Sequence, residues 1–236
     1  MLDPTVIRAL SFDLDDTLWD IWPTIARAEQ LLHDWLRRHH PAIPARYRPH
    51  QLRELCRLIA EQQPEIAHDR SLLRKAALRH AADALALEAF CEHTAFEVFH
   101  QARNEVEFFS DALPSLSRLA ERYPLVALSN GNADLRLVGI DHLFTVALNP
   151  ASAGTAKPDP AMYRAACRAL DLAPAQLLHI GDDPELDVIG AARAGLPTVW
   201  LNRGGRRWPG GPRPTLEVRN LIQLEQVLGM TASRAG

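Results

Sequence analysis

The chain has 236 residues, of which 47 % are hydrophobic and 23 % charged, and its formal net charge is −3. This composition predicts a soluble globular protein, and the slightly acidic balance argues against a nucleic-acid binder that relies on a basic face. The length exceeds that of one typical compact domain, so a core domain with a smaller second domain is expected.

Cysteine usage and hydropathy indicate the compartment. The three cysteines, Cys56, Cys91 and Cys167, are widely spaced and odd in number, as is typical of reduced thiols in a cytoplasmic protein and not of a disulfide framework or a zinc site. The N-terminus lacks a basic-then-apolar signal pattern, and no apolar run approaches about 18 residues, so neither secretion nor a membrane span is expected. The sequence is compatible with a monomer and with a homodimer.

The first predicted element is a buried strand over residues 6–12, and clustered acids follow it directly. Asp13, Asp15 and Asp16 lie so close that their charges repel unless a cation is present. Alternation along the strand places Asp13 and Asp15 on the same side. Two carboxylates facing one spot indicate a divalent cation, acid–base chemistry or both. The alternative is a solvated turn in which Asp or Thr17 caps the next helix.

The next segment, residues 19–109, has only helical patterns. Apolar side chains recur at helical spacing between Pro23 and Pro41, and further helices are expected over residues 50–62, 70–87 and 88–108. No strand pattern interrupts them. We therefore predict a separate all-helical domain inserted at 19–109.

From Asp111 onward helices and strands alternate. Strands are predicted at 125–128, 144–148, 177–180 and 198–201, and helices at 112–122, 134–138, 160–170, 185–194 and 221–228. This alternation predicts an α/β fold with a doubly wound parallel sheet covered on both faces, which the first strand joins. The core then comprises residues 1–18 and 110–236, and the polar tail is expected to be disordered.

Polar residues follow each of the predicted strands that would end at the ligand-binding edge of such a sheet. Ser129 and the backbone N–H groups after it form a typical anion site. Lys157 offers a positive charge suited to a phosphate or a carboxylate, and Lys75 is the only other lysine. Asp182 would join Asp13 as an oxygen ligand for Mg²⁺. Together these groups would neutralise a phosphoryl group under nucleophilic attack.

Two further features have two interpretations each. The loop at 202–214 carries four arginines and Trp208; the arginines would contact an anionic substrate or partner, or the loop is simply solvated. Trp19 and Trp22 follow the acidic cluster and would stack on an aromatic substrate ring or pack the linker.

Four segments, in this order, resemble the motifs of the haloacid dehalogenase (HAD) superfamily, with its Rossmann-like core. They are Asp13-Leu-Asp15-Asp16-Thr17, Ser129-Asn130-Gly131, Lys157-Pro158, and Gly181-Asp182-Asp183 with Asp187. Each motif is short, but all four in order at predicted strand ends are highly specific. The resemblance covers the core, and the helical insertion resembles the C1 cap.

The resemblance implies a phosphohydrolase mechanism. Asp13 would be the nucleophile and form an aspartyl-phosphate, and Asp15 would act as general acid and base. Mg²⁺ would bind Asp13, the Asp15 carbonyl and Asp182, supported by Asp183 or Asp187. The phosphoryl group would be held by Ser129, Asn130 and Lys157.

The presence of an aspartate at the position of Asp15 distinguishes between the reactions of this superfamily. The dehalogenase and phosphonate-cleaving branches lack an aspartate there, whereas phosphatases and phosphomutases keep it. We therefore expect a phosphatase acting on a small phosphate monoester, with a phosphomutase or, less favoured, a non-catalytic binding protein as the alternatives. Residues 63–69, 123–133 and 178–183 resemble the bacterial flavin mononucleotide (FMN) phosphatases, which are similar to the ribitylaminouracil phosphate phosphatases. FMN or a riboflavin-pathway phosphate is the favoured substrate.

Overall fold

The computed structural model describes residues 2–230 and divides the chain into two compact units. The first comprises residues up to Asp20, Phe108–Gly131 and the chain from Ile140 on, and the second comprises Ile21–Glu107 and Asn132–Gly139. The insertion predicted at 19–109 thus overlaps the second unit, which also takes in residues 132–139. The polar tail predicted to be disordered follows residue 228, and its residues 231–236 lie outside the described part of the chain.

The first unit contains a six-stranded parallel sheet with the order β3-β2-β1-β4-β5-β6. This confirms the predicted α/β fold. In this order the chain reverses direction across the sheet at β1, and ligands bind at such a switch point, beyond the carboxyl ends of the strands. The strands are β1 (Ala9–Phe12), β2 (Leu125–Leu128), β3 (Val146–Leu148), β4 (Leu177–Gly181), β5 (Thr198–Leu201) and β6 (Leu216–Val218).

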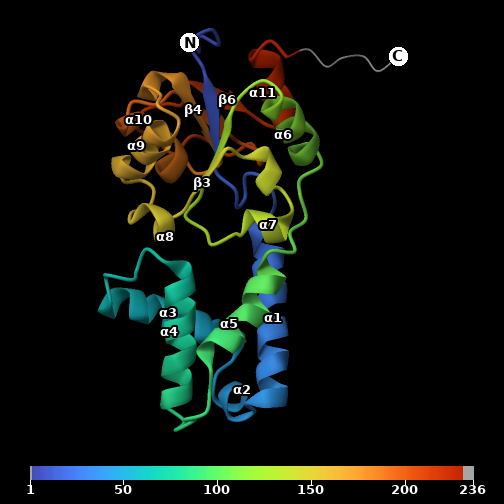
Figure 1. Cartoon of the computed structure of the whole chain (residues 1–236), viewed down its shortest axis with the longest axis vertical. Helices are drawn as coiled ribbons and strands as arrows, with labels where there is room; N and C mark the ends of the chain where they lie inside the picture. Colours follow the sequence, from blue (N-terminus) through green and yellow to red (C-terminus); the bar gives the residue numbers. More distant parts are fainter. Residues whose placement is uncertain (1, 231–236) are drawn as a thin grey trace. The chain divides into compact units, whose positions relative to one another are not determined.

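Helices cover both faces of this sheet, as its fully buried central strands require. Figure 1 shows α9 and α10 on one side and α6 and α11 on the other. Apolar residues of α9, such as Met162 and Ala166, pack with Val126 and Leu128 of β2 in a buried cluster. The helical segments of this unit are α6 (Ala112–Ala120), η1 (Asp141–Leu143), α8 (Pro150–Ala153), α9 (Pro160–Ala169), η2 (Pro174–Gln176), η3 (Pro184–Ile189), α10 (Gly190–Arg193) and α11 (Leu221–Val227).

Three differences from the predicted elements have physical causes. The first strand begins at Ala9 and not at Val6, whose side chain is 42 % exposed. The edge strand β6 was not predicted, because three residues after a Gly/Pro-rich loop give no alternation to detect. The helix predicted at 185–194 is a π-helix, η3, followed by α10, and apolar periodicity does not distinguish a wide π turn from an α turn.

The second unit is helical, as predicted for this part of the chain. Its buried core includes Leu32 and Leu36 of α1, Leu78 of α4, and Phe96 and Phe99 of α5. The buried carboxylate of Glu29 is paired with two arginines from neighbouring helices, Arg53 and Arg74. The helices are α1 (Ile21–His39), α2 (Ala42–Arg46), α3 (Pro49–Gln62), α4 (Arg70–Asp83), α5 (Glu92–Arg103) and α7 (Leu135–Val138).

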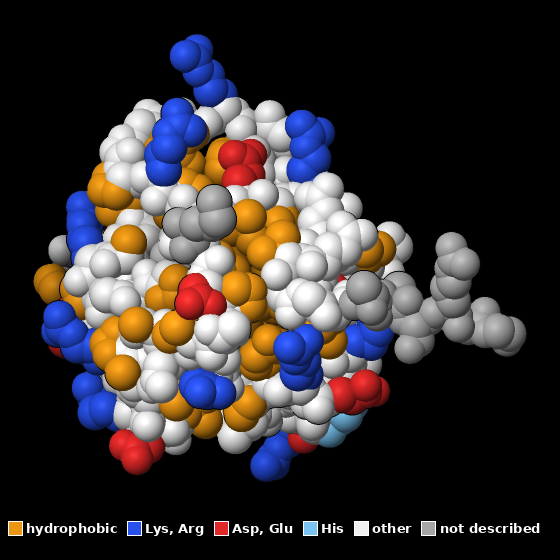
Figure 2. All heavy atoms as spheres, turned by 90° about the horizontal axis from the view of Figure 1, so that it is seen from above, with side chains coloured by type: hydrophobic (Ala, Val, Ile, Leu, Met, Phe, Trp, Pro, Cys, Tyr) orange, Lys and Arg blue, Asp and Glu red, His pale blue; other side chains and the backbone are white. Residues whose placement is uncertain are grey.

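Surface composition agrees with the balanced charge of the sequence. On the face shown in Figure 2, basic side chains are separated from one another by apolar and uncharged surface. All three cysteines carry free thiols. Within residues 2–230 we find no helix with the length and apolar character that a membrane span requires.

Candidate active site

Asp13 lies immediately beyond the carboxyl end of β1, the central strand at which the sheet order reverses. Its backbone N–H donates to the Ile180 carbonyl of β4 at 2.9 Å, which extends the strand pairing by one residue and fixes the side chain at the edge. The side chain is buried, and the Thr17 hydroxyl donates to its Oδ2 at 3.1 Å. Burial raises the pKa of Asp13 well above its usual value, although Lys157 opposes this shift.

Lys157 is the cation that compensates this buried charge. Its Nζ donates to Asp13 Oδ1 and to Asp187 Oδ1, both at 2.6 Å. Burial alone would lower the pKa of Lys157, but the two carboxylates outweigh it and raise that pKa. A buried ammonium with two carboxylate partners stays charged. Lys157 therefore links the end of β1 to the segment that follows β4.

Asn130 positions Lys157 through the backbone. Its Nδ2 donates to the Lys157 carbonyl and its Oδ1 accepts from the Lys157 N–H, each at 2.8 Å. The amide side chain predicted to hold the phosphoryl group is thus engaged by the lysine segment. The neighbouring Ser129 is buried, and its Oγ accepts from the Gly131 N–H at 2.9 Å. Its hydroxyl proton remains available for an acceptor.

Asp187 reaches the cluster from the π-helix η3. Its Oδ1 also contacts His179 Nε2 at 3.2 Å, and its Oδ2 accepts from the Asp183 N–H at 2.9 Å. Burial would raise the pKa of Asp187, but Lys157 and the His179 hydrogen bond lower it well below its usual value. The carboxylate fits here because residue 181 is glycine: a Cβ at Gly181 would lie 2.2 Å from Asp187 Cγ.

We expect Gly181→Ala to displace Asp187 and weaken the whole cluster. The added methyl group cannot coexist with the Asp187 carboxylate, so we predict a loss of about 2 kcal/mol in unfolding free energy and a lower activity. Gly204→Ala is the matched control, because a Cβ there meets nothing closer than 3.9 Å. Urea unfolding of both variants tests this; equal stabilities would show that the close approach is not required.

A set of three carboxylates at this edge could hold a metal ion. Asp13, Asp182 and Asp187 each offer an oxygen within 4.8 Å of the others. Burial, with the neighbouring charges of Asp187 and Asp16, raises the pKa of Asp182 to about 7. Buried carboxylates that repel one another suit a hard divalent cation such as Mg²⁺, which prefers oxygen ligands. The residues present therefore fit the metal that the sequence motifs imply.

The two carboxylates predicted to support the metal have different roles in the structure. Asp183 caps the N-terminus of η3, since its Oδ1 accepts from the N–H groups of Glu185 and Leu186 at 2.8 Å. Asp187 is the one that belongs to the cluster. Asp183 thus stabilises the N-terminus of the π-helix that carries Asp187, which is a common role for an aspartate at the start of a helix.

Asp15 is held by the first of the two linker tryptophans. The indole Nε1 of Trp19 donates to Asp15 Oδ1 at 2.9 Å. Trp19 itself is fully buried and packs edge-on against Phe108, with ring centroids 5.4 Å apart. Of the two predicted roles for Trp19, the structure therefore supports packing, with the added function of orienting Asp15.

The unusual pKa of Asp182 has a consequence for stability. The folded protein keeps this proton up to about pH 7, whereas the unfolded chain releases it near pH 4. Between these values the unfolded state binds fewer protons, so this group lowers stability as pH rises, by at most about 4 kcal/mol, and the loss is complete above about pH 7. His179, whose pKa is lowered by burial, acts in the opposite sense.

We therefore expect the difference in unfolding free energy between wild type and Asp182→Asn to depend on pH. In EDTA, wild-type unfolding free energy should fall relative to that of the variant between about pH 4 and pH 7 and then run parallel to it. Denaturant unfolding at several pH values measures this difference. A constant difference across that range would contradict the raised pKa.

Several residues that contact this cluster have no predicted role in it. His179 is fully buried and links Ser11 Oγ, at 2.8 Å from its Nδ1, to Asp187. A polar residue in a strand with otherwise apolar neighbours was the available signal. Arg203 and Arg206 of the loop at 202–214 also contact the site: Arg203 donates to the Thr17 carbonyl, and Arg206 contacts Asp182.

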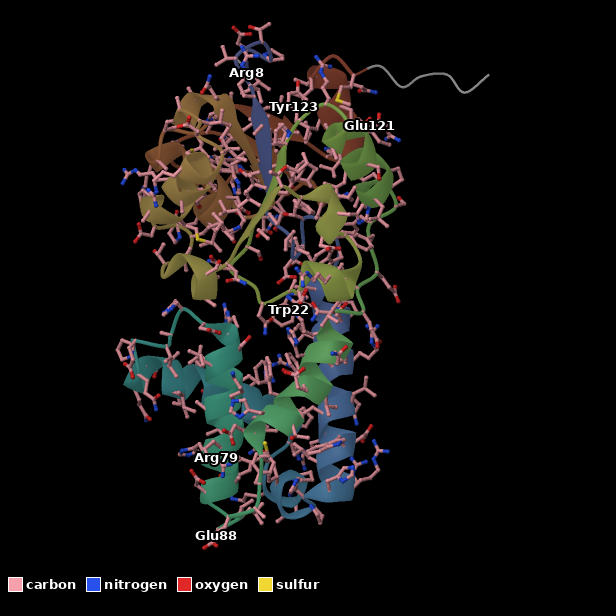
Figure 3. All side chains as sticks on the ribbon, viewed as in Figure 1. Arg8, Trp22, Arg79, Glu88, Glu121 and Tyr123 are labelled. Atoms are coloured by element: carbon pink, nitrogen blue, oxygen red, sulfur yellow. The ribbon has the colours of Figure 1, made fainter. Side chains whose placement is uncertain are left out.

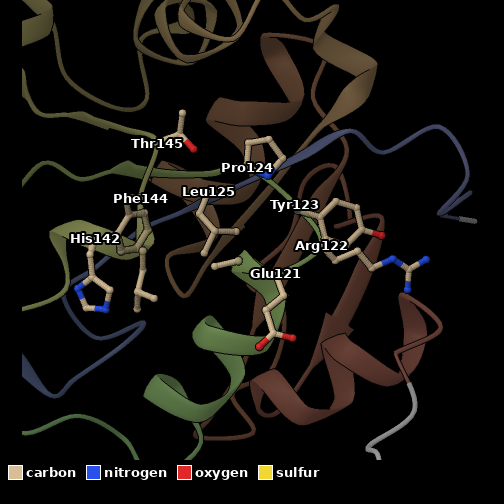
Figure 4. A pocket seen from close by; sticks show the side chains of 10 residues that line it. Glu121, Arg122, Tyr123, Pro124, Leu125, His142, Phe144 and Thr145 are labelled. Carbon is tan, nitrogen blue, oxygen red and sulfur yellow. The ribbon is translucent and has the colours of Figure 1, made fainter.

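A separate cavity lies at the opposite, amino-terminal edge of the sheet. Arg8 and Tyr123, which precede β1 and β2, mark this edge in Figure 3. The cavity has a volume of about 550 Å³, and Glu121, His142 and Phe144 are among its lining residues (Figure 4). None of the clustered carboxylates, nor Lys157, lines it. The candidate active site is therefore the carboxyl edge of the sheet.

The sequence of this chain is similar to those of known hydrolases. Residues 7–195 match the family model of haloacid dehalogenase-like hydrolases. The chain is 33 % identical to 5-amino-6-(5-phospho-D-ribitylamino)uracil phosphatase YigB of Escherichia coli (strain K12), over 94 % of this chain and 96 % of that protein. It is 29 % identical to an (S)-2-haloacid dehalogenase of Pseudomonas sp. (strain YL), over 97 % of each.

Among solved structures, a protein described as 2-haloacid dehalogenase from Pseudomonas syringae pv. Tomato DC3000 is similar. It superimposes with a TM-score of 0.88 at 35 % identity, and the match covers 94 % of this chain and 98 % of that one. Relatives at this level of identity thus carry two activity names, a phosphatase and a dehalogenase.

Proposed function

The chain belongs to the family of haloacid dehalogenase-like hydrolases, and we propose from this premise that it is a Mg²⁺-dependent phosphatase acting on a small phosphorylated metabolite. One observation carries the choice of reaction. The carboxylate of Asp15, oriented by Trp19, lies two residues after the buried Asp13. An acid beside the nucleophile is needed where the leaving group is an alkoxide.

In the first step, Asp13 attacks the phosphorus atom. Its carboxylate is held on one oxygen by Lys157 and on the other by Thr17, so the attacking group is fixed before substrate arrives. The bond from phosphorus to the ester oxygen breaks as the aspartyl-phosphate forms, and Asp15 gives its proton to the leaving alkoxide.

In the second step, Asp15 is a carboxylate and accepts a proton from water. That water attacks phosphorus, the bond to Asp13 breaks, and inorganic phosphate leaves with Asp13 restored. Asp15 serves as both acid and base, because the proton that it loses in the first step leaves it as the carboxylate that the second step needs.

The remaining groups offset charge. Mg²⁺, when bound by Asp13, Asp182 and the carbonyl of Asp15, would neutralise negative charge on the phosphoryl group. Lys157 contributes a fixed positive charge, and the Ser129 hydroxyl and nearby backbone N–H groups donate hydrogen bonds to phosphoryl oxygens. We assign Asn130 to positioning Lys157, because its amide is engaged by that residue's backbone.

Dehalogenase activity is the second candidate, since some relatives carry that name. Halide is a good leaving group that needs no protonation, so a dehalogenase has no use for an acid at residue 15. The presence of Asp15 favours phosphate transfer on chemical grounds.

For the substrate we propose a riboflavin-pathway phosphate, with FMN as the related alternative. Support comes from the similarity to the ribitylaminouracil phosphatase, which extends over nearly the whole of both chains and so includes the helical unit. We propose that this unit serves as the cap that selects the substrate.

A release assay tests this proposal. Inorganic phosphate would be measured from 5-amino-6-(5-phospho-D-ribitylamino)uracil, FMN, phosphoserine and an aryl phosphate, and halide from a 2-haloacid, each with Mg²⁺ and with EDTA. We expect Mg²⁺-dependent phosphate release with the ribityl phosphates ranked first. Halide release without phosphate release would assign the chain to the dehalogenases, and another rank order would reject the substrate class alone.

A further inference from the structure

The arginine-rich loop after β5 is fastened to the core through Asn202. This side chain is 1 % exposed, and its Nδ2 donates both to the Arg206 carbonyl at 2.8 Å and to Glu217 at 2.7 Å. Its Oδ1 accepts from the Arg206 N–H at 2.7 Å. A buried amide that closes two hydrogen bonds on one residue fixes that residue's backbone position. Arg206 is therefore held in place although its loop is rich in glycine and proline.

The backbone position of Arg206 directs its guanidinium to Asp182. Nη2 contacts the Asp182 backbone carbonyl at 2.5 Å and the carboxylate Oδ2 at 3.2 Å. The same carbonyl accepts from the Trp200 indole at 2.8 Å. The other carboxylate oxygen, Oδ1, faces Thr17 at 3.4 Å. Asp182 is thus a member of the carboxylate cluster that also contacts an arginine.

We propose that Arg206 is a built-in positive charge that weakens divalent-cation binding at the Asp13–Asp182–Asp187 cluster. This inference rests on the metal dependence in the proposed function. A cation held through Asp182 shares that carboxylate with Arg206, and two positive charges on one carboxylate repel. Arg206 would then set the affinity of the site lower than its carboxylates alone would give.

The main alternative is that Arg206 strengthens metal binding. An arginine can also orient a metal-binding carboxylate, and its loss would then weaken binding. The structure favours repulsion, because Asp182 is already positioned by Trp200 through its carbonyl and by its place directly after β4. The side chain of Arg206 is 54 % exposed, so the effect should be moderate and should depend on salt.

The experiment is titration calorimetry of the full chain with Mg²⁺ alone, at about 0.02 M and about 0.3 M salt. We expect Arg206→Gln to bind Mg²⁺ about fivefold more tightly than wild type at low salt, with a smaller difference at high salt. Arg206→Lys retains the charge and should stay near the wild-type affinity. Arg207→Gln, which removes the same charge from the exposed adjacent residue, should change the affinity less than Arg206→Gln does.

Different outcomes would overturn the proposed role of Arg206 and the proposed phosphatase function. Equal or weaker Mg²⁺ binding by Arg206→Gln, with normal binding by wild type, overturns the role of Arg206 and leaves the phosphatase proposal standing. An equal gain in Arg206→Gln and Arg207→Gln would assign the effect to the loop's net charge and also overturn it. Absence of Mg²⁺ binding by wild type would overturn both proposals.

Discussion

Asp13→Asn should abolish turnover, with kcat falling by at least about 10³-fold, on the scale seen when a catalytic nucleophile is removed. The amide is not nucleophilic enough to attack phosphorus, and it cannot form an acyl phosphate that water reopens. The fold should survive, because Lys157 retains Asp187 as a partner at 2.6 Å. Phosphate release and denaturant unfolding of the same preparation measure both parts.

The matched control for this variant is Asp159→Asn. Asp159 caps α9 by accepting from the Ala161 N–H, and asparagine is an equally good cap, so activity and stability should be unchanged. Residual turnover of Asp13→Asn within about tenfold of wild type would mean that Asp13 is not the nucleophile, since such a loss is within what a binding role explains.

Lys157→Met should be damaging to stability as well as to activity. It removes the cation that both Asp13 and Asp187 contact and leaves two buried carboxylates facing each other. Losing one partner of a buried pair costs about 3–5 kcal/mol. The loss should be smaller at low pH, because the stranded carboxylates then take up protons. Urea unfolding at pH 5 and pH 8 measures the loss and its direction.

Lys75→Met is the control, since Lys75 is the chain's only other lysine. It lies on α4 of the helical unit, with its Nζ 5.5 Å from the Phe96 ring centre, and its replacement should cost less than about 1 kcal/mol. If Lys157→Met were no more damaging than Lys75→Met, the buried charge network would not stabilise the core.

Local patterns were enough to predict five of the six strands of the sheet and their order along the chain. Strands such as Leu125–Leu128 are short apolar runs bounded by turn residues, and proline and glycine mark many of the helix ends. The candidate site followed from one topological rule, because the carboxyl ends of parallel strands meet at one edge. Asp13, Lys157 and Asp187 are accordingly joined in the structure.

The unpredicted parts depend on contacts between residues that are far apart in the chain. Arg203 donates to a carbonyl 186 residues away, and no local pattern distinguishes it from the solvated arginines of the same loop. The role of Asn130 as a support for Lys157 depends on two backbone hydrogen bonds across 27 residues. The choice between Asp183 and Asp187 depended on the π turn, which brings Asp187 and not Asp183 into the cluster.

The most direct test of the account is chemical trapping of the phosphorylated residue. We would mix Asp15→Asn with an aryl phosphate and Mg²⁺, quench with acid, reduce with borohydride and map the modified residue by mass spectrometry. An aryl leaving group needs little protonation, so phosphorylation should proceed while hydrolysis, which needs the base at residue 15, is slow. We expect reduction of Asp13 to homoserine only when substrate is present. Trapping at any other residue, or phosphate release with no trapped Asp13, would contradict it.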